Sequence, residues 1–172
     1  RGDGGDQGQG GAVRRHLLVT NDFPPKVGGI QSYLWELWRR LPPDDVAIHT
    51  TPYAGADAFD ADQAFTLSRS REPVLLPTRS VARRVGRLAA GHDAELVVWD
   101  PALPVGYAAS RVDRPYAVVL HGAEVTVPGR LPVCRSLLAR VLSGASLVIC
   151  AGNYPAMEAS RAADRDLPTV VV

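Results

Sequence analysis

Two adjacent glycines, Gly28 and Gly29, stand between a short apolar segment and an amphipathic one. They end the loop of residues 21–29, which reads NDFPPKVGG. Glycines at the start of a helix leave backbone N–H groups accessible, and the helix N-terminus adds partial positive charge, so this loop is suited to bind a phosphate or diphosphate. Alternatively, the glycines only permit a tight turn with positive φ. The loop matches neither G-x-G-x-x-G nor the P-loop, so a nicotinamide cofactor or an ATPase is not indicated.

A histidine, His121, directly follows the apolar residues 117–120 and precedes Gly122. A strand that ends in histidine places an imidazole over the crevice where parallel sheets bind their ligands. Gly122 allows a sugar or another backbone segment to approach closely, and Glu124 could orient the ring or bind a hydroxyl. The alternative is a histidine with a purely structural role at the end of a strand.

A basic stripe is the third feature, because Arg79, Arg83 and Arg87 recur every fourth residue, with Arg84 beside them. Apolar residues within 81–89 form the other side of the same predicted helix. A basic amphipathic helix can lie on an anionic bilayer, which makes these arginines candidate membrane contacts. The alternative is an ordinary solvated helix face.

The elements that would position these residues alternate along the chain. Short apolar runs predict strands at residues 16–20, 46–50, 64–68, 96–99, 117–120, 146–150 and 169–172. Helical spacing of apolar residues predicts helices at 30–41, 78–90, 105–110, 131–142 and 154–163. Apolar strands separated by helices indicate an α/β fold, a three-layer Rossmann-like domain with a mainly parallel sheet of about seven strands. In such a sheet the glycine loop and His121 lie at the same edge.

Length and composition agree with one globular domain of 172 residues, of which 46% are hydrophobic and 22% charged. The Gly-rich residues 1–12 predict a disordered tail, so the domain is expected over 13–172. The net charge of +1 argues against a nucleic-acid partner. No apolar run reaches the roughly 20 residues of a membrane helix. Cys134 and Cys150 are far apart and lack ligand spacing, so we expect no disulfide, no metal and a cytoplasmic location.

The loop motifs resemble those of a known enzyme family. The residues 21–25 (NDFPP) and 28–31 (GGIQ), followed about ninety residues later by His121-Gly122-x-Glu124, are similar to the amino-terminal domain of family-4 retaining glycosyltransferases with the GT-B architecture. Among these, the chain most resembles actinobacterial phosphatidylinositol mannosyltransferases over about residues 14–172. Many relatives carry a second histidine where this chain has Ala123.

The resemblance implies that residues 13–172 are the acceptor-side half of a GT-B fold, and that a carboxy-terminal donor-binding domain is absent from this chain. Gly28 and Gly29 would then bind the donor diphosphate through backbone N–H groups, and His121 would be catalytic at the donor sugar. The residues implied on the acceptor side are Gln31, Asp22 and Glu124.

The implied reaction transfers a hexose with retention, with mannose from GDP-mannose as the expected donor sugar and a phosphoinositide-type lipid as the expected acceptor. Charge would grow on the leaving diphosphate, which backbone N–H groups can stabilise. The nucleotide sugar is a substrate, and no further cofactor or metal is implied. The isolated chain is expected to be inactive, and its parent enzyme is expected to lie peripherally on the inner face of the plasma membrane. None of the three carboxylates that follow apolar runs has the spacing of a glycosidase pair: Asp22, Asp100 and Glu124.

Two other functions stay open from the sequence. The chain could be an α/β module that binds a sugar or nucleotide without catalysis, and the sequence that follows residue 172 would distinguish this from a transferase. It could also be a flavodoxin-like regulatory domain, but that fold expects clustered acidic residues at the end of the first strand, where only Asp22 stands.

Overall fold

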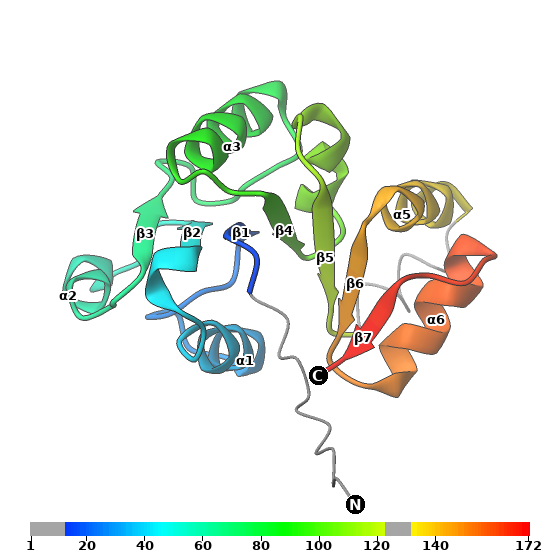
Figure 1. The fold of residues 1–172 in the computed structure, drawn as a ribbon, viewed down its shortest axis with the longest axis horizontal. Helices are drawn as coiled ribbons and strands as arrows, with labels where there is room; N and C mark the ends of the chain where they lie inside the picture. Colours follow the sequence, from blue (N-terminus) through cyan, green and yellow to red (C-terminus); the bar gives the residue numbers. More distant parts are fainter. Residues whose placement is uncertain (1–12, 123–131) are drawn as a thin grey trace, which may run out of the picture.

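The computed structural model describes residues 13–122 and 132–172, and in them the chain forms a seven-stranded sheet that is parallel throughout (Figure 1). The strands are β1 His16–Thr20, β2 Val46–Thr50, β3 Thr66–Arg69, β4 Leu96–Asp100, β5 Tyr116–Leu120, β6 Leu147–Cys150 and β7 Thr169–Val171. The helices are α1 Gly29–Trp38, α2 Ala56–Ala61, α3 Arg79–Gly91, α5 Pro132–Gly144 and α6 Asn153–Ala163, with 3-10 segments η1 Pro43–Asp45 and η2 Val105–Arg111. The predicted α/β class and parallel sheet are confirmed. The tail predicted at 1–12 lies outside the described residues.

The strand order is β3-β2-β1-β4-β5-β6-β7, so the chain first builds outward from β1 to β3 and then crosses back to build from β4 to β7. Right-handed crossovers place the helices of these two directions on opposite faces of the sheet. Accordingly, α1 packs in one hydrophobic core, and α3, η2 and α5 pack in the other. Figure 1 shows the two groups on either side of the strands.

The central strand β1 pairs with β2 on one side and β4 on the other, and this register decides which side chains meet at the carboxyl edge. Thr20 is the Cα partner of Asp100, so the last residues of β1 and β4 lie side by side. Strand β5 follows β4 in the sheet and leads directly into His121. The loops after β1, β4 and β5 therefore begin at adjacent points of one edge.

Several predicted boundaries needed correction. The helix expected at 30–41 ends at Trp38, because the N–H groups of Arg40 and Leu41 bond three residues back, a tighter turn ahead of Pro42. The third strand lies at Thr66–Arg69 rather than 64–68. Asp100 is the last residue of β4 and not part of the following loop. The short segments α2 and η1 were not predicted from the sequence.

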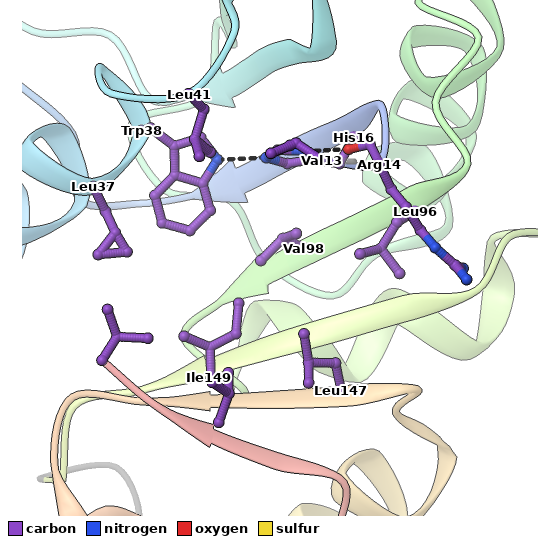
Figure 2. Close-up of a pocket in the computed structure, with 12 residues that line it drawn as sticks. Val13, Arg14, His16, Leu37, Trp38, Leu41, Leu96, Val98, Leu147 and Ile149 are labelled. Atoms are coloured by element: carbon purple, nitrogen blue, oxygen red, sulfur yellow. Dashed lines mark hydrogen bonds between the residues drawn. The ribbon is translucent and has the colours of Figure 1, made fainter. Parts of the chain in front are cut away.

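The two faces of the sheet are covered unequally. On the face of α1, side chains of β4 and β6 such as Leu96, Leu147 and Ile149 are only partly buried. They border a hollow of about 290 Å³ that is lined almost entirely by apolar side chains, with Leu37 and Trp38 of α1 on its other wall (Figure 2). The hollow extends along this face from the amino ends of β1, β4 and β6 to Val170 and Val172 at the end of the chain.

Across residues 13–122 and 132–172, every helix is too short or too polar to span a lipid bilayer.

Candidate functional site

The imidazole of His121 is held by a buried carboxylate. Its Nε2 lies 2.7 Å from Oδ1 of Asp100, and the other carboxylate oxygen, Oδ2, accepts a 2.6 Å hydrogen bond from the hydroxyl of Thr20. Asp100 is fully buried, and the side chain of His121 retains 10% of its accessible surface. The following residue, Gly122, has φ +119°, a conformation that side chains other than glycine rarely adopt. The ring is thus fixed at the carboxyl edge by two neighbouring strands.

A tyrosine of α1 connects this histidine to the glycine loop. The ring of Tyr33 meets the His121 ring edge to face, with centroids 5.4 Å apart and planes at 85°. Burial, together with the nearby Cys150 and Asp100, raises the pKa of Tyr33. Its hydroxyl oxygen is buried and finds no hydrogen-bond partner within the described part of the chain. Tyr33 stands only four residues after Gly29, so the start of α1 and His121 share one edge of the sheet, as the sequence predicted.

Different local features explain why glycine stands at positions 28 and 29. Gly28 has φ 166°, which is extended backbone, so a positive φ does not explain it. A Cβ at Gly28 would instead overlap Oε1 of Gln31. A Cβ at Gly29 would meet no heavy atom of residues 13–122 and 132–172 within 4 Å, and Gly29 is exposed among these residues. The alternative that these glycines only permit a tight turn with positive φ therefore explains neither of them.

The N-terminus of α1 carries the partial positive charge of a helix start. Among the described residues no side chain caps the helix, and its first turn contains no acidic residue. The first N–H groups of a helix have no acceptor within the helix, so they are directed outward toward any ligand at this end. The side chain of Lys26, two residues before Gly28, is 41% exposed, and its ammonium forms an ion pair with Asp22 in the same loop. Lys26 was not predicted as a site residue, although its place in the loop was a signal.

Asp22 and Gln31 are engaged with each other. Oδ1 of Asp22 accepts hydrogen bonds from Nε2 of Gln31 and from Nζ of Lys26, both at 2.7 Å. The backbone N–H of Asp22 donates to the hydroxyl of Thr20 at 2.9 Å. Gln31 retains only 7% of its accessible surface. Its amide thus serves to brace the loop, and the predicted acceptor contact by Gln31 stays a prediction.

Arg69, the last residue of β3, ties the glycine loop to its neighbours. Its guanidinium donates to the carbonyl oxygens of Pro24 at 2.7 Å and Thr51 at 2.9 Å, and it forms an ion pair with Asp60. Because the bidentate ion pair fixes the guanidinium plane, the backbone at Pro24 is fixed as well. Sequence reasoning missed Arg69, since nothing in the chain order brings residue 69 near residue 24.

The remaining predicted site residues are Glu124 and the arginines of α3. Glu124 lies outside the described residues. Arg84 donates two hydrogen bonds to Glu72, which lower the pKa of that carboxyl to about 2, and its contact with a membrane stays a prediction. The other three arginines of α3, Arg79, Arg83 and Arg87, are exposed.

Comparison with known proteins places the chain among glycosyltransferases. No family model matches it. It is 40% identical over 152 residues to the GDP-mannose-dependent alpha-(1-6)-phosphatidylinositol monomannoside mannosyltransferase of Mycobacterium tuberculosis, covering 83% of this chain and 39% of that protein. It is 36% identical over 149 residues to the protein of the same name in Mycolicibacterium smegmatis, covering 80% and 38%. A monoacylated-acceptor mannosyltransferase of Corynebacterium glutamicum is 30% identical over 120 residues, covering 66% and 32%.

Among solved structures, HepE of Anabaena in complex with UDP superposes with a TM-score of 0.65 at 19% identity, covering 92% of this chain and 43% of that one. Its complex with UDP-glucose gives a TM-score of 0.62 at 20% identity, covering 91% and 43%. The chain spans about two fifths of the length of the curated relatives it matches. The chain is thus a relative of the actinobacterial phosphatidylinositol mannosyltransferases, and its fold is the Rossmann-like fold found in GT-B glycosyltransferases.

Proposed function

We propose that the chain is the acceptor-side half of a retaining mannosyltransferase that uses GDP-mannose and a phosphatidylinositol-type lipid. The names of its relatives support the donor and the acceptor class. The observation that carries this function is the start of α1 at Gly29, which no side chain of the described residues caps and which is connected through Tyr33 to the ring of His121. A diphosphate bound at this helix start would lie beside the imidazole that Asp100 holds.

In this mechanism the N–H groups at the start of α1 bind the donor diphosphate. Negative charge grows on the diphosphate as the bond to the anomeric carbon breaks, and donors that are already oriented stabilise it without reorganisation. Lys26 lies at the same end, where its ammonium is paired with Asp22. His121, held by Asp100, contacts the sugar and keeps it in line with the acceptor, since positioning contributes a large share of such a rate.

The acceptor binds on the side of the loop that carries Asp22. The carboxylate of Asp22 retains 25% of its accessible surface while accepting from Lys26 and Gln31. Gln31 holds this carboxylate in place, and a hydroxyl of the acceptor headgroup donates to it. We assign Glu124 to the same side on the resemblance alone.

The lipid acceptor brings the enzyme to an anionic membrane surface. The exposed arginines of α3, Arg79, Arg83 and Arg87, follow two apolar side chains, Val74 and Leu76, that are each 50% exposed. Cations flanking exposed apolar side chains are the composition expected for contact with anionic headgroups.

The substitution Gly29→Ala tests the diphosphate site. Alanine favours the helix over glycine by up to about 1 kcal/mol, and its methyl group meets no atom of the described residues, so the free energy of unfolding should hold or rise. The methyl group would occupy the space proposed for the diphosphate, so affinity for GDP-mannose should fall about tenfold or more. Isothermal titration with GDP-mannose measures the affinity, and urea unfolding measures the stability.

Gly86→Ala is the matched control, because Gly86 lies within α3 and its added Cβ also meets nothing within 4 Å. It should gain stability without changing GDP-mannose binding. If Gly29→Ala binds GDP-mannose as well as the wild type does, the diphosphate site is not at the start of α1.

Catalysis separates the transferase from a module that only binds a sugar nucleotide. A full-length enzyme containing residues 13–172 should transfer radiolabelled mannose from GDP-mannose to phosphatidylinositol monomannoside, and His121→Ala should reduce kcat strongly while leaving the fold intact. The 172-residue chain by itself should give no turnover. Full activity of the His121→Ala enzyme would exclude the role proposed for this residue.

A further inference from the structure

Three side chains form a continuous line across the carboxyl edge of the sheet. Thr20 ends β1, Asp100 ends β4, and His121 follows β5. The carboxylate between them is fully buried, and its two oxygens are engaged on opposite sides, by the Thr20 hydroxyl at 2.6 Å and by Nε2 of His121 at 2.7 Å. Burying a carboxyl group is costly unless its oxygens find partners, so this arrangement holds the imidazole strongly.

The direction of each hydrogen bond follows from the groups present. The oxygen of Thr20 accepts the N–H of Asp22 at 2.9 Å, which leaves its one proton to donate to Oδ2 of Asp100. Oδ1 then faces His121 as an acceptor, so the ring nitrogen opposite it carries a proton.

We propose that Asp100 is a positioning residue of this site: braced by Thr20, it places a proton on Nε2 of His121 and thereby fixes the tautomer of the ring. In the neutral ring Nδ1 is then the accepting nitrogen, and Tyr33 fixes the ring plane from the side of α1. The importance of this tautomer for catalysis rests on the proposed mannosyl transfer, but the placement of the proton does not.

The variant Asp100→Asn exchanges one carboxylate oxygen for an NH₂ group. The hydroxyl proton of Thr20 selects the amide oxygen, which leaves the NH₂ group facing His121. Nε2 must then accept, so the ring should change from the Nε2–H to the Nδ1–H tautomer. The ¹⁵N chemical shifts of the imidazole, measured on the 172-residue chain and assigned with His121→Gln, report the tautomer directly.

The double variant Thr20→Val/Asp100→Asn removes the group that selects the amide orientation. The amide oxygen is then free to turn toward His121, so the Nε2–H form should reappear. Thr20→Val alone keeps a carboxylate that accepts from either oxygen, so its ring should stay Nε2–H. A merely structural role of Asp100 does not produce this reversal. Asp113→Asn, an exposed aspartate just before β5, is the control that should change nothing.

The same variants in the full-length enzyme test the catalytic consequence. Asp100→Asn should lower kcat about tenfold or more with the KM for GDP-mannose nearly unchanged, and the double variant should recover part of the loss. An Asp100→Asn ring that stays Nε2–H overturns the placement of the proton. A changed tautomer with unchanged kcat overturns its role in catalysis. If the wild-type enzyme transfers no mannose, the proposed function fails, and the ¹⁵N shifts alone decide the role of Asp100.

Discussion

His49, in the middle of the sheet, is held neutral by its surroundings. Burial, with the positive charge of Arg84 nearby, lowers its pKa to about 4, and its Nε2 has no hydrogen-bond partner within the described residues. Burial also lowers the pKa of His16, whose Nε2 accepts from the indole N–H of Trp38 at 2.8 Å. Both rings therefore stay neutral in the folded chain at pH values where the unfolded chain already binds protons.

The free energy of unfolding should consequently fall between pH 7 and pH 5. Both histidines have a folded pKa below the unfolded value, so the unfolded chain binds more protons as the pH drops through about 6.5, and stability is lost until the folded pKa is reached. For His49 the loss in the free energy of unfolding between pH 7 and pH 5 amounts to about 2 kcal/mol. Urea unfolding followed by circular dichroism at both pH values measures it.

His49→Leu provides the comparison, because leucine does not titrate at the same buried position. The difference in stability between pH 7 and pH 5 should shrink in this variant, and the contribution of His16 should persist. An unchanged difference would mean that His49 already titrates normally in the folded chain.

Sequence reasoning placed some residues of the site and missed others for a physical reason. The glycine loop and His121 were predicted to share one edge, and Tyr33 joins them there. Asp100 was noticed only as a carboxylate after a strand. Its contact with His121 depends on the register that sets Thr20 beside Asp100, and register between distant strands is not visible in a single sequence.

At the scale of the elements, the strands were predicted well because buried parallel strands are continuous apolar runs. Strands β1 and β2 have the predicted bounds. Helix α2 was missed because its six residues, ADAFDA, are too few to show a helical period. Helix α1 ended early because the residues before Pro42 favour a tighter turn over a further α-helical one.

Helix α3 should bind anionic vesicles through its exposed arginines. Replacing Arg79, Arg83 and Arg87 together by glutamine removes three charges, each worth about 1 kcal/mol at such a surface, so binding should weaken by about a hundredfold. Sedimentation with phosphatidylcholine vesicles that contain phosphatidylinositol measures the bound fraction.

Arg84→Gln is the matched control on the same helix, because the charge of Arg84 is already neutralised by Glu72. It should change vesicle binding little. Equal losses for Arg84→Gln and the triple variant, or no loss for either, would show that α3 does not contact the bilayer in the proposed way.

At the scale of the whole molecule, the two faces of the sheet should contribute unequally to stability. Leu120 is fully buried in the core beneath α3, η2 and α5, whereas Leu147 is only partly buried on the face of α1. Leu120→Ala should cost about 2–5 kcal/mol, as expected for a fully enclosed leucine. Leu147→Ala should cost clearly less, since solvent already reaches its side chain.

Urea unfolding of the two variants checks this difference. Comparable losses would indicate that Leu147 is enclosed in solution by something that covers the hollow of Figure 2. The topology explains the hollow, because the described helical segments that follow β3, which are α3, η2, α5 and α6, pack on the other face.

The strand order also fixes when the site can form during synthesis. Strand β1 lies between β2 and β4 in the sheet. It is translated before both, and β4 ends at Asp100, eighty residues after its hydrogen-bond partner Thr20 at the end of β1. At typical bacterial elongation rates the ribosome needs about 4–16 s for that stretch, during which one edge of the nascent central strand has no partner. The glycine loop therefore leaves the ribosome well before the strand that carries His121, and the emerging chain acquires its complete ligand edge only after residue 121 has been released.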